Sequence, residues 1–207
     1  MLNAVIDISH HNGPSLDFAA AKLDGVLGVI HKASQGASGI DPMYSANRKK
    51  ANAAGMLWGA YHFATGNVAL QQATHFLESI GDPTGVLMVL DFEPNITGSS
   101  MSLDQARMFV TYIHAQTGRW PGFYSGSMIK QLLGDKKDDV LANCWFWLAQ
   151  YGPKATVPEN WTTWTMWQYT DGAVGDQPKT VKGIGPCDRD RFNGDVEGLH
   201  RLWSVPV

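Results

Sequence analysis

The sequence predicts a single α/β domain built around an eight-stranded barrel. Five strand-like segments alternate with helix-like segments, and three further strand-like segments follow with no long helix between them. Eight strands close naturally into a barrel whose interior is filled by side chains. The chain has 207 residues, of which 44% are hydrophobic, and this is enough to bury a large core. Because local patterns do not show closure, an open doubly wound sheet remains the alternative.

The first five units each pair an apolar, β-prone segment with a segment of helical periodicity. Each helix candidate carries apolar residues at three-to-four spacing, and several end at a glycine, which is a typical helix stop. Repeated strand–helix units predict a parallel sheet. The expected strands are 4–9, 26–34, 56–64, 85–93 and 121–126, and the expected helices are 16–25, 41–55, 67–81, 102–118 and 127–134.

The last third of the chain predicts strands without crossover helices. Segments 144–152, 162–171 and 185–194 are rich in β-branched and aromatic residues or bounded by turn residues, and only the short segment "DVEGLHRLW" follows them. No stretch rich in Pro, Gly or Ser divides the chain. We therefore expect one domain over residues 1–207 and no separate module.

Charge and composition exclude several classes of partner. The net charge is −3 and the 16 basic residues are scattered, which argues against nucleic acid and membrane surfaces as partners. No apolar run approaches about 18 residues, and the N-terminus lacks the basic and apolar regions of a signal peptide. Cys144 and Cys187 follow no metal-ligand spacing and are expected to be reduced, half-buried thiols. We also expect a monomer.

The segment "GVLMVLDFEPN" places two acids at the end of an apolar strand. Side chains in a strand alternate, so Asp91 and Glu93 should share one face, with Cα atoms about 6.5 to 7 Å apart, while Phe92 points the other way. At the end of a barrel strand this face borders the mouth of the barrel, where active sites are built. Other predicted strand ends bring further polar residues to the same mouth: Asp7, His10, Lys32, Tyr61, His62, Tyr124, Gln150, Tyr151, Gln168, Asp188 and Asp190.

Several carboxylates in one pocket predict acid–base chemistry. They cannot all ionise cheaply, so at least one should hold a proton near neutral pH. We expect Asp91 to stay ionised and to raise the pKa of Glu93, which makes Glu93 a general acid. Glycoside hydrolysis needs such a pair. The 8 Trp and 6 Tyr residues, many in the last third, suit the apolar faces of sugar rings.

Two other classes of function use the same residues. A metal-dependent barrel hydrolase would hold a divalent ion with an oxygen-rich ligand set: Asp7, His10, Asp91, Glu93 and Asp188. A non-catalytic glycan-binding domain would keep the aromatic groove without the chemistry. Insensitivity to chelators argues against the first, and turnover of a glycan argues against the second.

The chain resembles the glycoside hydrolase family 25 lysozymes, the Chalaropsis-type muramidases, in eight motifs taken in order. They are "VIDISHHNG", "KASQG", "GAYHFA", "VLDFEP", "GFYSG", "WLAQYG", "WQYTDG" and "CDRDRFNG", between residues 5 and 194. The resemblance implies a (β/α)5(β)3 barrel. It also implies hydrolysis of the β-1,4 bond between N-acetylmuramic acid and N-acetylglucosamine, with participation of the substrate's acetamido group.

The resemblance also implies roles for individual residues. Glu93 would be the general acid and base, Asp91 would assist it, and Asp7 and Asp188 would complete the acidic floor. Four residues that match the family would bind substrate: Tyr61, Tyr124, Tyr151 and Gln168. Lys32 and His10, which also lie at predicted strand ends, are expected to bind substrate with them. The family usually has Val-Asp-Leu-Asn where this chain has Cys-Asp-Arg-Asp, so Arg189 and Asp190 depart from its pattern.

The expected partner is the glycan strand of peptidoglycan, and no cofactor or metal is expected. The protein would act on the bacterial cell wall after extracellular or periplasmic delivery. It would do so as one catalytic domain over residues 1–207, without a separate cell-wall-binding module. Without a signal peptide in this sequence, delivery would depend on phage lysis or non-classical export.

Overall fold

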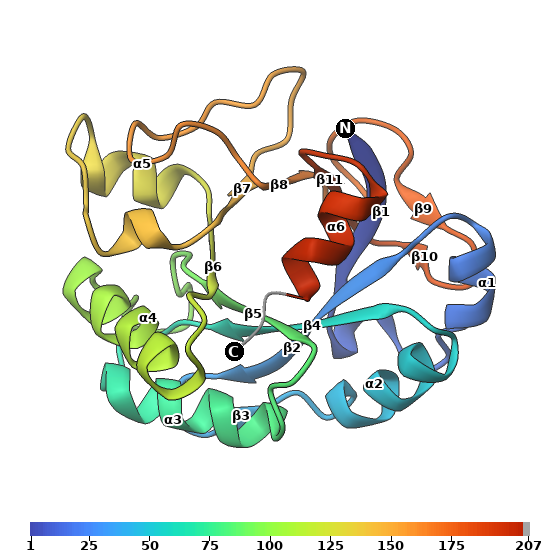
Figure 1. Cartoon of the computed structure of the whole chain (residues 1–207), viewed down its shortest axis with the longest axis horizontal. Helices are drawn as coiled ribbons and strands as arrows, with labels where there is room; N and C mark the ends of the chain where they lie inside the picture. The colour runs from blue at the N-terminus through green and yellow to red at the C-terminus, as the bar shows by residue number, and fades with distance from the viewer. Residues whose placement is uncertain (205–207) are drawn as a thin grey trace.

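The backbone of the computed structural model forms a closed barrel, described here for residues 1–204 (Figure 1). Its strands follow the order β1-β11-β8-β7-β6-β5-β4-β2, and a parallel pairing of β1 with β2 closes the ring. The predicted barrel is therefore confirmed, and the open sheet is wrong. The barrel strands are β1 (Leu2–Ile8), β2 (Gly28–Gln35), β4 (Leu57–Phe63), β5 (Val86–Asp91), β6 (Gly122–Ser125), β7 (Phe146–Ala149), β8 (Met166–Thr170) and β11 (Asp188–Phe192).

Among the eight barrel strands, direction changes only at β11. The other seven pair in parallel, whereas β11 is antiparallel to both β1 and β8. The start of β11, and not its end, therefore lies at the mouth of the barrel. Asp188 is the first residue of this strand and pairs with Asp7 near the end of β1. The sequence analysis expected Asp188 at the mouth with the ends of the other strands. It lies there because β11 is antiparallel, so that its first residue is at the mouth.

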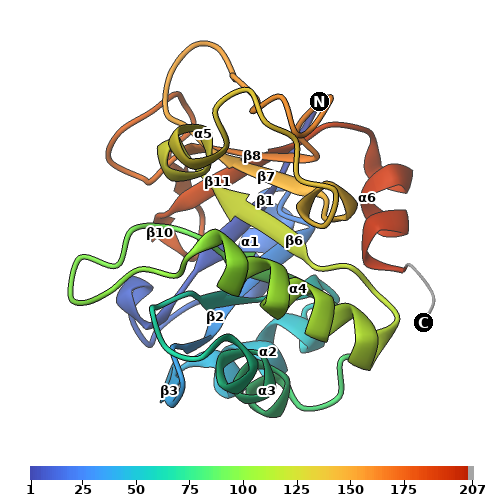
Figure 2. The ribbon, with the colours of Figure 1, turned by 90° about the vertical axis from the view of Figure 1, so that its left-hand side faces the viewer.

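The five predicted helices are present and lie outside the barrel (Figures 1 and 2). Local signals set their ends: Ser102 forms a capping box at the start of α4, and Gly118 ends α4 in the left-handed region. Several are shorter than predicted, since turn residues occupy their ends. The helices are α1 (Phe18–Leu23), α2 (Tyr44–Ala53), α3 (Ala69–Ile80), α4 (Leu103–Thr117) and α5 (Ser127–Leu133).

A sixth helix, α6 (Val196–Trp203), was not predicted. Asp195 caps it by accepting a hydrogen bond from the Gly198 amide. Trp203 at its end packs against Gly28 and donates its indole N–H to the carbonyl of Trp58, at 2.8 Å. Because both partners lie near strand starts, α6 covers the end of the barrel opposite the mouth. The short pieces β3 (Gly39–Ile40), β9 (Thr180–Val181), β10 (Gly185–Pro186), η1 (His10–Asn12) and η2 (Leu141–Asn143) complete the elements.

The core has two layers. Buried apolar side chains from the strands fill the barrel interior, and a larger cluster packs between the strands and the surrounding helices. Cys144 and Cys187 are free and each 2% exposed, so the expected free thiols are fully buried and not half-buried. Burial raises the pKa of Cys187 to about 12. Within residues 1–204 no helix has the length and apolar character needed to cross a membrane.

Candidate active site

The tip of β5 is fixed by its neighbours on both sides. Every residue of β5 is buried. The Ala64 amide donates to the Asp91 carbonyl at 3.0 Å, and the Phe92 amide donates to the Tyr124 carbonyl at 2.9 Å. Ser125 Oγ donates to the Phe92 carbonyl at 2.7 Å. These bonds hold the backbone that carries the two acids, which is the rigidity a catalytic pair needs.

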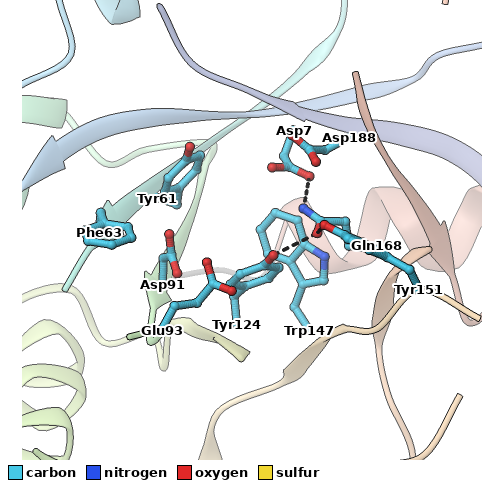
Figure 3. Close-up of a pocket in the computed structure, with 10 residues that line it drawn as sticks. All are labelled: Asp7, Tyr61, Phe63, Asp91, Glu93, Tyr124, Trp147, Tyr151, Gln168 and Asp188. Carbon is cyan, nitrogen blue, oxygen red and sulfur yellow. Dashed lines mark hydrogen bonds between the residues drawn. The ribbon is translucent and has the colours of Figure 1, made fainter. Parts of the chain in front are cut away.

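The alternation along this segment places its side chains as expected. Phe92 is fully buried and packs against Phe123, with ring centroids 5.3 Å apart. Asp91 and Glu93 both point into a pocket at the barrel mouth and lie side by side (Figure 3).

The pocket has a volume of about 260 Å³ and gathers eight of the ten residues proposed from the sequence. It brings together four acids, three tyrosines and a glutamine from seven strands or strand tips, and adds two aromatic residues that the sequence had not assigned to the site. The lining residues are Asp7, Tyr61, Phe63, Asp91, Glu93, Tyr124, Trp147, Tyr151, Gln168 and Asp188. Phe63 could have been found because it lies two residues after Tyr61, on the same face of β4.

Gln168 organises the polar side of the pocket (Figure 3). Its Oε1 accepts hydrogen bonds from the phenols of Tyr124 and Tyr151, each at 2.8 Å. Its Nε2 donates to Asp7 Oδ2 at 2.8 Å. The amide orientation is thereby fixed, since an inverted amide would face two phenol donors with its N–H groups. One residue thus links both tyrosines to the acidic floor.

The two acids of β5 both resist ionisation. Burial raises the pKa of Glu93. Burial also raises the pKa of Asp91 well above its usual value; the charge of Glu93 raises it further, and the charge of Lys32 opposes this. Asp91 is 6% exposed, and in the described part of the chain no hydrogen-bond donor reaches its Oδ1. Burial and the missing donor therefore work against the expected ionised state of Asp91, whereas the charge of Lys32 supports it.

The floor acids behave in the same way. Burial raises the pKa of Asp188 to about 7, with the charge of Asp171 adding to the rise. Burial raises the pKa of Asp7 well above its usual value, and the charges of Asp188 and Asp190 add to it. The pocket therefore retains protons near neutral pH, which is the property a general acid requires.

Lys32 and His10 do not line the pocket. Lys32 Nζ donates to Gln35 Oε1 at 2.6 Å and lies 5.0 Å from the centroid of the Phe63 ring. His10 belongs to η1, and its Nδ1 lies 2.7 Å from Asp41 Oδ2. The lysine still bears on the chemistry, since its charge lowers the pKa of Asp91.

This effect of Lys32 predicts a change in pH dependence. In Lys32→Met the opposing charge is lost, so the pKa of Asp91 rises and a higher pH is needed to ionise it. We expect the acidic limb of the kcat/KM profile to move to higher pH. Lys32→Arg keeps the charge and serves as the control. An acidic limb unchanged in Lys32→Met would show that the lysine does not tune the pair.

Other residues predicted at strand ends lie outside the pocket. His62 points away from it, between Ser34 Oγ at 2.8 Å and Gln72 Oε1 at 3.2 Å. Gln150 Oε1 accepts from Lys130 Nζ at 2.6 Å. Arg189 and Asp190 are equally absent from the lining.

The side chains of the two residues that depart from the family pattern point in opposite directions. Arg189 points outward, and its Nη1 donates to the carbonyl of Thr180 at 2.6 Å. Asp190 points inward and is fully buried, with its Oδ1 accepting from Trp147 Nε1 at 2.7 Å. Only Asp190 therefore alters the surroundings of the pocket.

No three His, Cys, Asp or Glu side chains within residues 1–204 converge closely enough to hold a metal ion.

A closed barrel with paired, proton-retaining acids and an aromatic wall at its mouth defines a glycoside hydrolase. The chain belongs to the glycosyl hydrolases family 25, whose model matches residues 6–176. It is 33% identical to Lysozyme M1 of Streptomyces globisporus over 95% of this chain and 70% of that protein. It is 30% identical to the N,O-diacetylmuramidase of Chalaropsis sp over 95% of this chain and 96% of that protein.

Solved structures show the same architecture. The bacterial lysozyme from Streptomyces coelicolor superposes with a TM-score of 0.86 at 32% identity, covering 100% of this chain and 98% of that one. The muramidase from Acremonium alcalophilum gives a TM-score of 0.84 at 30% identity, covering 99% of both chains. The resemblance seen in the motifs and the barrel that it implied are thereby confirmed.

Proposed function

We propose that the protein is an N-acetylmuramidase that hydrolyses the β-1,4 bond between N-acetylmuramic acid and N-acetylglucosamine in peptidoglycan. Support comes from its family, from relatives named lysozyme and N,O-diacetylmuramidase, and from the pocket itself. Its place of action would be the bacterial cell wall.

Glu93 is the general acid in this proposal. It lies at the pocket wall beyond the end of β5, and burial raises its pKa, so it can hold a proton when the glycan binds. It protonates the leaving oxygen as the glycosidic bond breaks and recovers a proton from the attacking water. The aromatic wall places the sugar ring against the acid pair.

The observation that carries the proposal is the unpartnered Oδ1 of Asp91 beside Glu93. A buried acceptor without a donor is costly, and an acetamido N–H of the substrate satisfies it. Oriented in this way, the acetamido carbonyl attacks the anomeric carbon, and the positive charge that develops on the acetamido group favours ionised Asp91. No enzyme nucleophile is then required.

The identity of the new reducing ends tests the bond that is cut. Purified peptidoglycan is digested, the products are reduced with borohydride, and the ends are identified by mass spectrometry. We expect reduced muramic acid. Reduced glucosamine would contradict the assignment, and anhydromuramic products would indicate a lytic transglycosylase.

The same digest separates the two alternatives. A non-catalytic glycan-binding domain would release no reducing ends. A metal-dependent hydrolase would lose its activity after treatment with EDTA and regain it with added divalent ion, whereas we expect EDTA to have no effect.

A further inference from the structure

Asp190 lies in the closed interior of the barrel, beneath the pocket. Its strand, β11, runs between β1 and β8, and Asp190 itself pairs with Val5 on one side and Gln168 on the other. The residue is 0% exposed. A carboxylate this deep is strongly disfavoured unless hydrogen bonds satisfy both of its oxygens.

Only one of these oxygens has a donor. Oδ1 accepts from the Trp147 indole N–H at 2.7 Å, whereas Oδ2 is buried and meets no N–H or O–H donor from residues 1–204. Asp7 follows Val5 by two residues on β1, so its side chain shares a face with Val5, beside Asp190. The carboxyl of Asp7 lies within hydrogen-bonding reach of Asp190. Two ionised carboxylates are acceptors only, so a hydrogen bond between them requires a proton.

The surrounding charges favour keeping that proton. Burial is the largest cause that raises the pKa of both Asp7 and Asp190, and the charge of Asp188 adds to each. Arg189 is a cation that acts on Asp190, but its guanidinium is directed outward to the carbonyl of Thr180. The indole of Trp147 is neutral and supplies a single donor.

We propose that Asp190 is a positioning residue that shares one proton with Asp7 and so fixes the Asp7 carboxyl at the pocket floor. Asp7 is then held from both sides, by Asp190 below and by Gln168 Nε2 at 2.8 Å. Asp190 also holds Trp147, so two pocket-lining side chains from β1 and β7 meet at one buried acid. The effect of Asp190 on turnover rests on the proposed function, whereas the sharing of a proton between Asp190 and Asp7 does not.

A count of protons tests the pair directly. Unfolded aspartate has a pKa near 3.9, so at pH 7 unfolding releases the shared proton. In Asp190→Asn the amide N–H replaces that proton, and unfolding should release one proton fewer than in the parent. The count is the slope of the unfolding free energy against pH, measured around pH 7. The unfolding free energy should fall less steeply with rising pH in Asp190→Asn than in the parent.

Asp138→Asn is the matched control. Asp138 is a buried acid, 5% exposed, paired with Arg107 Nε at 2.7 Å, and it does not line the pocket. Its substitution should lower stability and leave the proton shared by Asp7 and Asp190 in place. An Asp190→Asn variant that releases as many protons as the parent would overturn the proposal.

Turnover separates positioning from simple structural support. Asp190→Asn keeps a donor to Asp7 and should keep most of the parent's kcat, while Asp190→Leu removes the donor and should lose about tenfold or more. Equal activity in the asparagine and leucine variants would contradict the positioning role. If the parent itself cleaves no peptidoglycan, the proposed function fails, and the proton count still decides whether the pair exists.

Discussion

Glu93→Gln should lose on the order of 10² to 10⁴ in kcat, the usual scale for removing a general acid. Glutamine keeps the shape of the side chain but cannot protonate the leaving oxygen. The measurement is the rate of release of reducing ends from purified peptidoglycan at the parent's optimal pH. Because the substitution leaves the size of the pocket unchanged, KM should change far less than kcat.

Two controls make the result interpretable. The thermal unfolding midpoint should be at least that of the parent, since replacing a buried acid whose pKa is raised removes a group that resists burial. Glu78→Gln, on α3 and outside the pocket, should keep the parent's rate. Activity of Glu93→Gln within tenfold of the parent would move the acid role elsewhere, with Asp188 the next candidate.

Asp91→Asn should lose about 10² to 10³ in kcat, the scale seen when one electrostatic partner of a transition state is removed. Asparagine keeps the shape but removes the negative charge that steadies the acetamido group. It also relieves the repulsion within the pair, so the pKa of Glu93 should fall. The alkaline limb of the pH profile should then move to lower pH.

The two effects of Asp91→Asn can be separated. If the rate falls while the pH profile stays in place, the electrostatic coupling is absent and Asp91 serves only to orient the acetamido group. If neither changes, the acid pair at the tip of β5 is structural. Phe92→Leu, which alters the opposite face of the segment, should lower stability through lost packing without moving the pH profile.

The sequence predicted the barrel and most of the pocket because both follow from alternation along strands. Asp91 and Glu93 share a face since their spacing is two, and Tyr61, Tyr124 and Gln168 reach the same mouth because parallel strands end together. These features are local or follow from a shared strand direction. They therefore need no knowledge of how distant side chains pack.

The remaining features depend on packing or direction that periodicity does not encode. Alternation is the same in both directions along a strand, so the antiparallel course of β11 could not be predicted. Lys32 was expected at the pocket, but its long side chain turns to Gln35. Helix α6 has only eight residues and contains Gly198, so its propensity is weak; its cap Asp195 was the available signal.

The most direct test of the central claim compares the parent and Glu93→Gln in one digestion of purified peptidoglycan, with the reduced products identified by mass spectrometry. The proposed muramidase activity predicts reduced muramic acid as the new end from the parent. The role of Glu93 as the acid predicts that this product is nearly absent from the variant over the same time. Reduced glucosamine from the parent would contradict the muramidase. Equal release of muramic acid ends by the two proteins would contradict Glu93 as the acid.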